Sequence, residues 1–370
     1  MTGHRAHKLS LVASVLLAGL LAAVSVPADG PVYVLDDSWP DPLPATWGAI
    51  GEVAGQAVDA DGHIWIIHRG YQITGVVPPV LEFDRNGTLL QAWGGPGAGY
   101  TWPTTEHGLY VDADGNVWTA GNTHQVLKFT HDGRFLMAIG VANSTGGSDD
   151  TSRLGSAADI VVDPIAGEVY VADGYANHRV IVFDATTGEY RRHWGAYGEP
   201  PNDLDATPRA FGLPVVGPVH CVEMSADRLI YVCDRDHYRI QVFQPDGTFV
   251  REHFIREDGG EDPAALLGVC TPQCGPAFDV AFSPDPEQRL MLVAVSYDIA
   301  PANAWQTRVF GPNEHVLMLE RATGALLGRI GTAGTEAGAF TGLHGVVTDA
   351  DGAVYTGEIT GARAQRFVPT

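Results

Sequence analysis

Basic residues are scarce in this chain of 370 residues, and lysine is almost absent. Lysine and arginine together number 22 against 44 aspartates and glutamates, which gives a formal net charge of −22. The only lysines are Lys8 and Lys128. Because phosphate binding needs clustered lysines and arginines, the composition excludes nucleic acid as a partner. Such acidity is typical of a soluble surface rather than of a site.

Long apolar runs are missing after the first thirty residues. Within those thirty, basic residues at positions 4–8 precede an apolar run over residues 9–26, and the small residue Ala28 follows. This order is typical of a secretory signal peptide, so we expect cleavage near Ala28 and a secreted, periplasmic or otherwise extracytoplasmic protein. A retained membrane anchor is the alternative, since the run is almost long enough to span a bilayer. After cleavage we expect no membrane contact.

Cysteine is also rare, with four residues in the chain. Cys221 and Cys233 lie on two strand-like runs joined by a turn at residues 225–228, so hairpin pairing places them within reach of a disulfide. Cys270 and Cys274 are close in sequence within a loop rich in glycine and proline, which favours a local disulfide. A zinc site of four cysteines is the alternative, but neither pair has the C-x₂-C spacing.

The sequence does contain a repeat. Six segments share a short apolar strand, a turn of the Asp-x-Asp-Gly type, a second strand, a loop and a strand that bears arginine or glutamine. Four short strands repeated every 51 to 66 residues are typical of β-propeller blades, and the period-two alternation excludes a helical solenoid. We therefore expect an all-β, six-bladed β-propeller over residues 29–370. The aligned turn positions are Asp59, Asp112, Asp163, Ser225, Ser283 and Asp349.

The two ends of this repeat region fit together. The sixth segment ends at Phe367 without a fourth strand, and the strand-like residues 31–35 belong to no segment of their own. Pairing these two runs would supply the missing strand and remove an exposed sheet edge. The sequence thus predicts a ring closed by its N-terminal strand.

Histidines recur at one register position of the repeat. Five residues before each aligned turn position, where the first strand enters the central channel, histidine stands in the second, fourth and sixth segments. Alternate blades of a six-bladed ring are about 120° apart, so these imidazoles should converge on the channel axis. Three imidazoles with an open fourth position form a catalytic zinc site, although each histidine alone would more often be a packed or hydrogen-bonded residue. The three are His107, His220 and His344.

Loops that follow the second strands should lie at the same end of the central channel as these histidines. They carry Arg69, Tyr175 and Arg235, which would offer cationic groups for a substrate carboxylate and an ionisable phenol beside the metal. The alternative is that these residues belong to the scaffold. That structural role is what we expect of four other residues near these loops, which should form ion pairs: Asp173, Arg179, Asp234 and Arg239.

Two sets of motifs carry a resemblance to known proteins. The segments VYVADGYANHRVIVFD and IYVCDRDHYRIQVF resemble NHL repeats. The ordered motifs HRG, EHGLYVD, DGYANHR, VHCVEM, CDRDHYRIQ and LHGVV resemble peptidyl-α-hydroxyglycine α-amidating lyase over about residues 35–368. This resemblance implies a six-bladed propeller, a zinc ion held by the three histidines, Tyr175 as the catalytic base, and Arg69 and Arg235 on the substrate side.

The activity implied is cleavage of a carbinolamide to an amide and glyoxylate, with a small-molecule or peptide substrate that bears a carboxylate. Two other classes remain open on the residues alone: a zinc-dependent hydrolase, and an exported propeller that only binds a partner. We expect a monomer.

The sequence departs from the lyase pattern at three positions. Gly342 and Gly345 stand where the family has a methionine and a calcium-binding aspartate, which puts a structural Ca²⁺ in the channel in doubt, although backbone oxygens such as that of Leu109 could contribute. Ala176 replaces the cysteine that follows the catalytic tyrosine, so the family's disulfide pattern is not expected.

Overall fold

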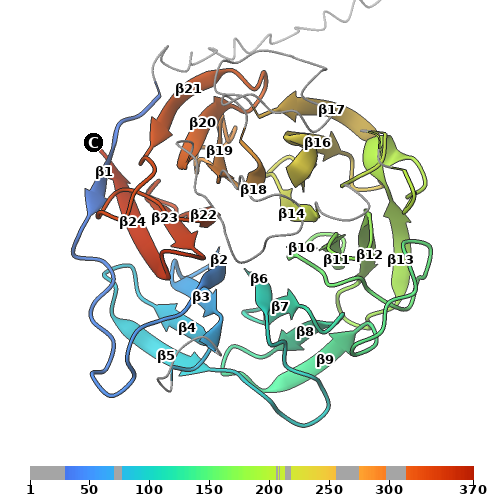
Figure 1. Ribbon diagram of the computed structural model, residues 1–370, viewed down its shortest axis with the longest axis horizontal. Coiled ribbons are helices and arrows are strands. Elements are labelled where there is room, and N and C mark those ends of the chain that lie inside the picture. Colours follow the sequence, from blue (N-terminus) through green and yellow to red (C-terminus); the bar gives the residue numbers. More distant parts are fainter. Residues whose placement is uncertain are drawn as a thin grey trace, which may run out of the picture.

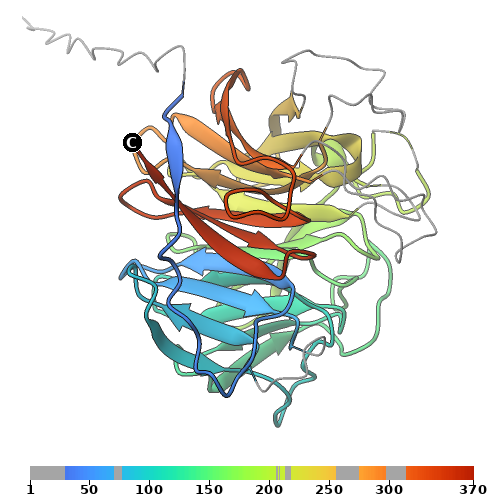
Figure 2. The same cartoon turned by 60° about the vertical axis from the view of Figure 1, so that its left-hand side comes forward.

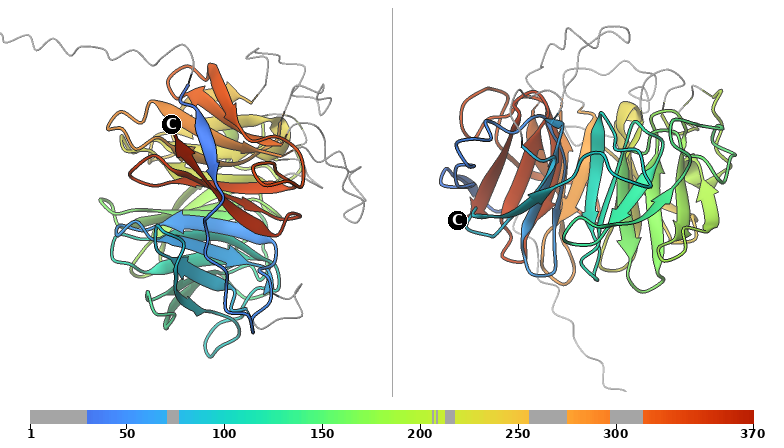
Figure 3. Two further views of the ribbon diagram at one scale, coloured as in Figure 1. Left: turned by 90° about the vertical axis from the view of Figure 1, so that its left-hand side faces the viewer. Right: turned by 90° about the horizontal axis from the view of Figure 1, so that it is seen from below.

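The computed structural model is a ring of six four-stranded antiparallel sheets around a central channel, as Figure 1 shows. It describes residues 30–70, 77–205, 207, 209–212, 218–255, 275–296 and 314–370. Seen edge-on in Figure 3, the ring is a disc whose strands run between its two faces. The predicted all-β, six-bladed propeller is confirmed.

Each blade runs outward from the channel in chain order, except that the N-terminal strand is the outermost strand of blade six. Blade one comprises β2 (Val53–Val58), β3 (Ile64–His68), β4 (Val80–Phe83) and β5 (Leu89–Trp93). Blade two comprises β6 (Glu106–Val111), β7 (Val117–Gly121), β8 (Val126–Phe129) and β9 (Phe135–Ile139). Blade three comprises β10 (Asp159–Asp163), β11 (Glu168–Asp173), β12 (Arg179–Asp184) and β13 (Tyr190–Trp194). Two short 3₁₀ turns, η2 (Ala196–Gly198) and η3 (Arg235–His237), lie in loops.

The other three blades follow the same order. Blade four comprises β14 (Val219–Met224), β15 (Ile230–Asp234), β16 (Arg239–Phe243) and β17 (Phe249–Phe254). Blade five comprises β18 (Ala277–Phe282), β19 (Leu290–Val295), β20 (His315–Glu320) and β21 (Leu326–Ile330). Blade six comprises β22 (Leu343–Thr348), β23 (Val354–Glu358), β24 (Arg363–Pro369) and β1 (Tyr33–Asp36).

The repeated aspartate fixes the turn between the first two strands. Asp112 Oδ1 accepts hydrogen bonds from the backbone amides of Asp114 and Asn116. Its Oδ2 accepts one from the indole of Trp118 at 2.9 Å, and that indole is fully buried between blades. Gly115 takes the left-handed conformation that closes the turn, with φ of 77°. One carboxylate therefore orders the turn and positions a core side chain on the following strand.

The inner strands are irregular where they enter the channel. In β14 and β22 the pairing register shifts across His220 and His344, and in β6 it shifts across Gly108, directly after His107. Such β-bulges leave one residue unpaired and re-aim the neighbouring side chains. Gly108 is required here, because a Cβ at this position would lie 2.7 Å from the carbonyl oxygen of Ala158.

Buried ion pairs hold the loops at the mouth of blades three and four. Arg179 Nε donates to Asp173 Oδ2 at 2.9 Å, and Arg239 Nη2 lies 2.7 Å from Asp234 Oδ2, with all four side chains fully buried. The Arg179 guanidinium also donates to carbonyl oxygens of the loop at residues 148–153. Because each pair satisfies its own charges, these residues are structural, as predicted.

A disulfide joins the two inner strands of blade four. Cys221 and Cys233 lie directly opposite each other on β14 and β15, with their Cα atoms 4.8 Å apart. This predicted pair is confirmed, and it fixes β14 next to His220. The second predicted pair, Cys270 and Cys274, lies outside the described residues.

The N-terminal strand closes the ring, as Figure 2 shows. β1 pairs antiparallel with β24, with Leu35 opposite Phe367. The side chain of Leu35 packs against the apolar cluster between blades five and six, and Asp36 accepts a 2.9 Å hydrogen bond from Arg366. The predicted closure is confirmed. No helix among the described residues is long and apolar enough to cross a membrane, and the predicted signal peptide lies outside them.

Replacing Leu35 by Asp should destabilise the whole ring, because it places a carboxylate against the apolar cluster that β1 covers. We expect a loss of about 2–4 kcal/mol in unfolding free energy, measured by urea denaturation. The matched control is Val34→Asp on the outward face of the same strand, where the side chain is exposed. This control should change stability by less than about 0.5 kcal/mol. Equal effects of the two substitutions, or an unchanged stability after deletion of residues 31–36, would contradict the closure.

Candidate metal centre at the mouth of the channel

The three predicted histidines meet on the channel axis. His107 on β6, His220 on β14 and His344 on β22 have ring centroids 4.7 to 4.9 Å apart, so they form a nearly equilateral triangle. Their candidate ligand nitrogens lie within 4.8 Å of one another, and all three side chains are buried. The convergence expected from alternate blades is therefore observed, and the group is able to hold a metal ion.

Backbone carbonyls orient two of the imidazoles. Nδ1 of His107 donates to the oxygen of Ala158 at 2.6 Å, and Nδ1 of His220 donates to the oxygen of Phe278 at 2.6 Å. Donation from Nδ1 leaves Nε2 as the unprotonated nitrogen, which is the form that binds a metal. In the described part of the chain, the buried Nε2 of His220 has no hydrogen-bond partner.

Burial keeps these imidazoles neutral. Loss of solvent, with repulsion from Arg69 as the next cause, lowers the pKa of His107 to about 3. Burial also holds the pKa of His220 and of His344 well below the ordinary range, and repulsion from His107 adds to it. Neutral imidazoles are ready to bind a cation without first losing protons. Three imidazole nitrogens are a ligand set that Zn²⁺ prefers among the common divalent ions. The unpartnered Nε2 of His220 is free to be one of these ligands.

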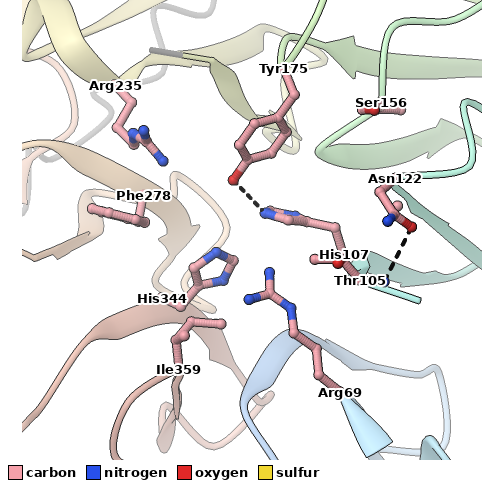
Figure 4. A pocket seen from close by; sticks show the side chains of 12 residues that line it. Arg69, Thr105, His107, Asn122, Ser156, Tyr175, Arg235, Phe278, His344 and Ile359 are labelled. Atoms are coloured by element: carbon pink, nitrogen blue, oxygen red, sulfur yellow. Dashed lines mark hydrogen bonds between the residues drawn. The ribbon is translucent and has the colours of Figure 1, made fainter. Parts of the chain in front are cut away.

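Tyr175 lies directly against the histidine group. It is in the loop after β11, its hydroxyl is 2.9 Å from His107 Nε2, and its side chain is 38% exposed. Figure 4 shows the phenol oxygen turned into the space above His107 and His344. The structure therefore places an ionisable oxygen both at the metal-binding atoms and at the open side of the channel.

Two arginines approach the same space from opposite sides (Figure 4). Arg69, in the loop after β3, is anchored by Glu52 at 2.6 Å through Nη1 and by the Glu106 carbonyl at 3.2 Å through Nε. Arg235, after β15, lies over the ring of Phe278 at 5.0 Å. The predicted positions at the mouth are thus observed, and each guanidinium is held by a neighbour rather than extended into solvent.

A cavity of about 290 Å³ joins these groups. Its walls are more apolar than polar and include the side chains of Phe278 and Ile359. Cavities of this size suit a small molecule or the end of a peptide. The lining side chains that also carry charge or ionisable groups are Arg69, His107, Tyr175, Arg235 and His344.

Sequence reasoning missed several residues that complete the site. Phe278 stands at the same register position as the histidines and packs 4.9 Å from the His220 ring, while its carbonyl orients that imidazole. Its place in the repeat register could have marked it. Glu52 and Glu106 carried no such signal, because their contact with Arg69 depends on how the loops of blades one and two fold together.

Comparisons with known proteins identify relatives of this chain. No family model matches the chain. It is 31% identical over 234 residues to peptidyl-glycine alpha-amidating monooxygenase B of Xenopus laevis, a match covering 57% of this chain and 25% of that protein. It is 25% identical over 370 residues to peptidyl-alpha-hydroxyglycine alpha-amidating lyase 1 of Drosophila melanogaster, covering 91% of this chain and 60% of that protein.

A third relative bears the repeat in its name. NHL repeat-containing protein 3 of Mus musculus is 28% identical over 235 residues, covering 60% of each protein. The matches thus span about a quarter of the Xenopus protein and 60% of the other two. Together these relatives confirm the resemblance to NHL-repeat proteins and amidating lyases.

Solved structures agree on the fold. A streptogramin B lyase has a TM-score of 0.52 at 12% identity, with 91% of this chain and 98% of that chain covered. Virginiamycin B lyase from Staphylococcus aureus has a TM-score of 0.50 at 13% identity, with 90% and 85% covered. At these identities the likeness shows the propeller architecture alone.

Replacing any one of the three histidines by Ala should remove most of the metal affinity, because each supplies one of three nitrogens. We expect wild type to bind about one zinc per chain and each variant to bind at least about 100-fold more weakly, measured by elemental analysis and calorimetry. His193→Ala, on the outer strand β13, is the matched control and should bind like wild type. Wild-type protein that stays metal-free after zinc loading would contradict the site.

His68, beside Arg69, should make stability fall in acid. Gly51 N donates to its Nδ1 at 3.2 Å and its Nε2 donates to the Pro78 carbonyl at 3.0 Å, so the fold holds the neutral ring. Burial lowers the pKa of His68 to about 4. In the unfolded chain the pKa of His68 is about 6.5. As the pH falls from 6.5 to 4, the unfolded chain therefore binds a proton at His68 that the folded chain does not bind. This difference lowers the unfolding free energy by up to about 3 kcal/mol.

The comparison that isolates this effect is urea unfolding of wild type and His68→Gln at pH 7 and pH 4. Groups shared by both proteins cancel, so wild type should lose more unfolding free energy on acidification than the variant. The same loss in both would show that the His68 ring is not the group responsible.

Proposed function

We propose that this protein is a zinc-dependent lyase that cleaves a peptidyl-α-hydroxyglycine-like carbinolamide, N–CH(OH)–COO⁻, into an amide and glyoxylate. The observation that carries the proposal is one cavity lined by the neutral imidazoles of His107 and His344, by a phenol 2.9 Å from His107 and by two arginines, with His220 completing the histidine group behind it. The named relatives support it, since a lyase of this name matches most of the chain.

The histidine group would hold the metal, which when bound supplies a Lewis acid that makes the substrate hydroxyl more acidic. Ala158 and Phe278 contribute through their carbonyls, which keep Nε2 of His107 and of His220 turned to the channel axis. Because the rings are pre-oriented and neutral, the protein does not need to rearrange to accept the ion.

Tyr175 is the proposed general base. Its oxygen is adjacent to the imidazole nitrogens, so a substrate hydroxyl directed to that point would lie within proton-transfer distance. The phenolate would take the hydroxyl proton; the carbon–nitrogen bond breaks as the carbon–oxygen double bond of glyoxylate forms, and the amide nitrogen receives a proton. Reactant and products balance without water or an oxidant.

Arg69 and Arg235 would bind the substrate carboxylate. They face one cavity from two sides, and their positive charges favour an anionic group between them (Figure 4). The same charges lower the pKa of all three histidines, after the larger effect of burial. Anchoring by Glu52 and by the Phe278 ring limits the motion of the guanidinium groups, which reduces the entropy lost on binding.

An extracytoplasmic monomer is the setting that we propose for this activity. The Cys221–Cys233 disulfide is consistent with an oxidising compartment, in which such bonds persist. The predicted signal peptide would deliver the chain there. The substrate would be a peptide or small molecule already hydroxylated at the carbon next to its carboxylate.

Replacing Tyr175 by Phe should lower glyoxylate release by about 10²–10⁴-fold, because only the ionisable oxygen is lost. Melting temperature and bound zinc should stay close to those of wild type. Tyr190→Phe is the matched control, since Tyr190 is also 38% exposed but lies on β13 at the ring's outer edge. If Tyr175→Phe turns over like wild type, the base assignment is wrong, and a zinc-dependent hydrolase or a binding propeller becomes the better reading.

Replacing Arg69 or Arg235 by Ala should mainly weaken the binding of carboxylate-bearing substrates. Loss of one charge-assisted hydrogen bond corresponds to about 1.5–3 kcal/mol, or roughly 10- to 150-fold in kcat/KM. A substrate analogue whose carboxylate is converted to an amide should be much less sensitive to either substitution. A purely scaffold role would instead lower the melting temperature and affect both substrates equally.

A further inference from the structure

Two histidines and two carboxylates meet where blade one adjoins blade two, outside the channel (Figure 1). Asp59 and His63 lie in the turn between β2 and β3, Glu82 lies on β4, and His131 lies in the turn between β8 and β9. Because neighbouring strands are antiparallel, these turns are at the face of the disc opposite the mouth that holds Tyr175. One ligand atom from each of Asp59, Glu82 and His131 lies within 4.8 Å of the others.

Glu82 is at the centre of this group. Its Oε1 lies 2.7 Å from Nδ1 of His63 and 3.3 Å from Nε2 of His131. The same nitrogen of His63 lies 3.6 Å from Asp59 Oδ2. In a tetrahedral zinc site with bonds of about 2.0–2.1 Å, neighbouring ligand atoms are about 3.3 Å apart. The three measured separations bracket this value, so these donor atoms are close to the spacing that one zinc ion requires.

Hydrogen bonds hold the oxygen of each carboxylate that faces away from the histidines. Asp59 Oδ1 accepts from the backbone amides of Asp61 at 3.0 Å and His63 at 2.8 Å. Glu82 Oε2 accepts from Nε2 of Gln91 at 2.6 Å. The Glu82 side chain is only 2% exposed and that of Asp59 only 7%. Contacts of this kind orient metal-binding side chains before an ion arrives.

The repeat shows what blade one lacks at this point. The position just before the repeated phenylalanine of the third strand carries a cation in blades two and six, Lys128 and Arg366, but Glu82 in blade one. Lys128 Nζ lies 4.5 Å from the centre of the Trp118 ring and 3.6 Å from Oδ2 of the turn aspartate, Asp112. Arg366 likewise lies over a tyrosine ring of the neighbouring strand at 5.7 Å. In these two blades a positive charge stands beside the turn.

In blade one no such cation is present. Within the described residues, neither Asp59 nor Glu82 forms an ion pair with lysine or arginine. The indole of Trp65 donates to Asp59 Oδ2 at 2.9 Å, as its counterpart in blade two does, but the side chain against this indole is His131, with ring centroids 4.9 Å apart. Two buried carboxylates and two imidazoles thus occupy the place where blades two and six have a positive charge.

We infer that Asp59, His63, Glu82 and His131 bind a second zinc ion, which joins blade one to blade two. Two imidazoles and two carboxylates are a ligand set that suits zinc. Calcium and magnesium prefer sets made of oxygen alone and would leave both imidazoles unused. The ion supplies the positive charge that a lysine provides in blade two, and its ligands come from both blades, so it stabilises their contact.

This site should bind zinc more weakly than the channel histidines do. The His131 side chain is 49% exposed, and its Nδ1 lies 3.0 Å from Nε2 of Gln91. A ring that binds zinc through Nε2 carries its proton on Nδ1, so the Gln91 amide must turn when the ion binds. The channel imidazoles, by contrast, are buried, and carbonyls already orient two of them. The channel therefore fills first, and protein freed of excess zinc keeps one ion per chain.

The test is calorimetric titration of chelator-stripped full-length protein with ZnCl₂. Wild type should show a tight and a weaker class of site, each binding one ion per chain. The melting temperature should rise again as the weaker site fills, because an ion bound only by the folded chain stabilises it. His107→Ala should lose the tight class and keep the weaker one. This result separates the inference from the proposed function, which depends on the channel site alone.

Variants of the four ligands test the site directly. His63→Ala and His131→Ala should keep the tight class and weaken the second class at least about tenfold, the usual minimum for loss of a group that supports a metal site. Glu82→Lys copies Lys128 of blade two, so it should abolish the second class and leave a melting temperature that no longer responds to further zinc. Asp61→Asn, an exposed carboxylate in the same turn, is the matched control and should bind like wild type.

A single class of zinc site in wild type, up to roughly 0.1 mM free zinc, would overturn the inference. A second class that persists unchanged in both His63→Ala and His131→Ala would also overturn it, because other side chains would then hold the ion. In either case the two histidines serve only as hydrogen-bond partners of Glu82. If Glu82→Lys fails to fold, His131→Ala decides, since that ring is half exposed.

Discussion

The pairing of β1 with β24 is the constraint on which the rest of this structure depends. A propeller sets the angle between its blades only when the ring is closed, and here closure joins residues 33–36 to residues 366–369. The three histidines come from alternate blades, so their meeting on one axis is a property of the closed ring. An opened ring would keep the blades as sheets but would separate the ligands.

The channel concentrates polar groups that would be unstable if buried alone. Burial keeps the three imidazoles neutral, and carbonyls of the next blade around the ring orient those of His107 and His220. β-bulges at the strand entrances lie beside these contacts. The carboxylates of Asp159, Glu223 and Asp279 lie beside them, on inner strands. Two kinds of side chain, imidazoles and carboxylates, thus share one channel.

The mouth of the channel shows how a rigid scaffold serves a reactive site. Arg179 and Arg239 form ion pairs with buried aspartates and so order the loops. Arg69 and Arg235 are also held by neighbours, but they line the cavity. The loops that carry Tyr175 and Arg235 follow strands that these ion pairs hold in place. Positioning and chemistry are therefore performed by different arginines: Arg179 and Arg239 begin the third strand of their blades, whereas Arg69 and Arg235 directly follow the second.

The sequence by itself determined the blade count, the closing strand, the Cys221–Cys233 pair and the register of the three histidines, because a repeat places equivalent residues at equivalent points. Only the tertiary structure decided that Phe278 orients His220, that Glu52 anchors Arg69, and that Asp159, Glu223, Asp279 and Gln56 form one group. Apart from the Glu52–Arg69 pair within blade one, these contacts join residues on different blades that are far apart in the sequence. Their proximity depends on strand stagger and on bulges, which the repeat pattern does not encode.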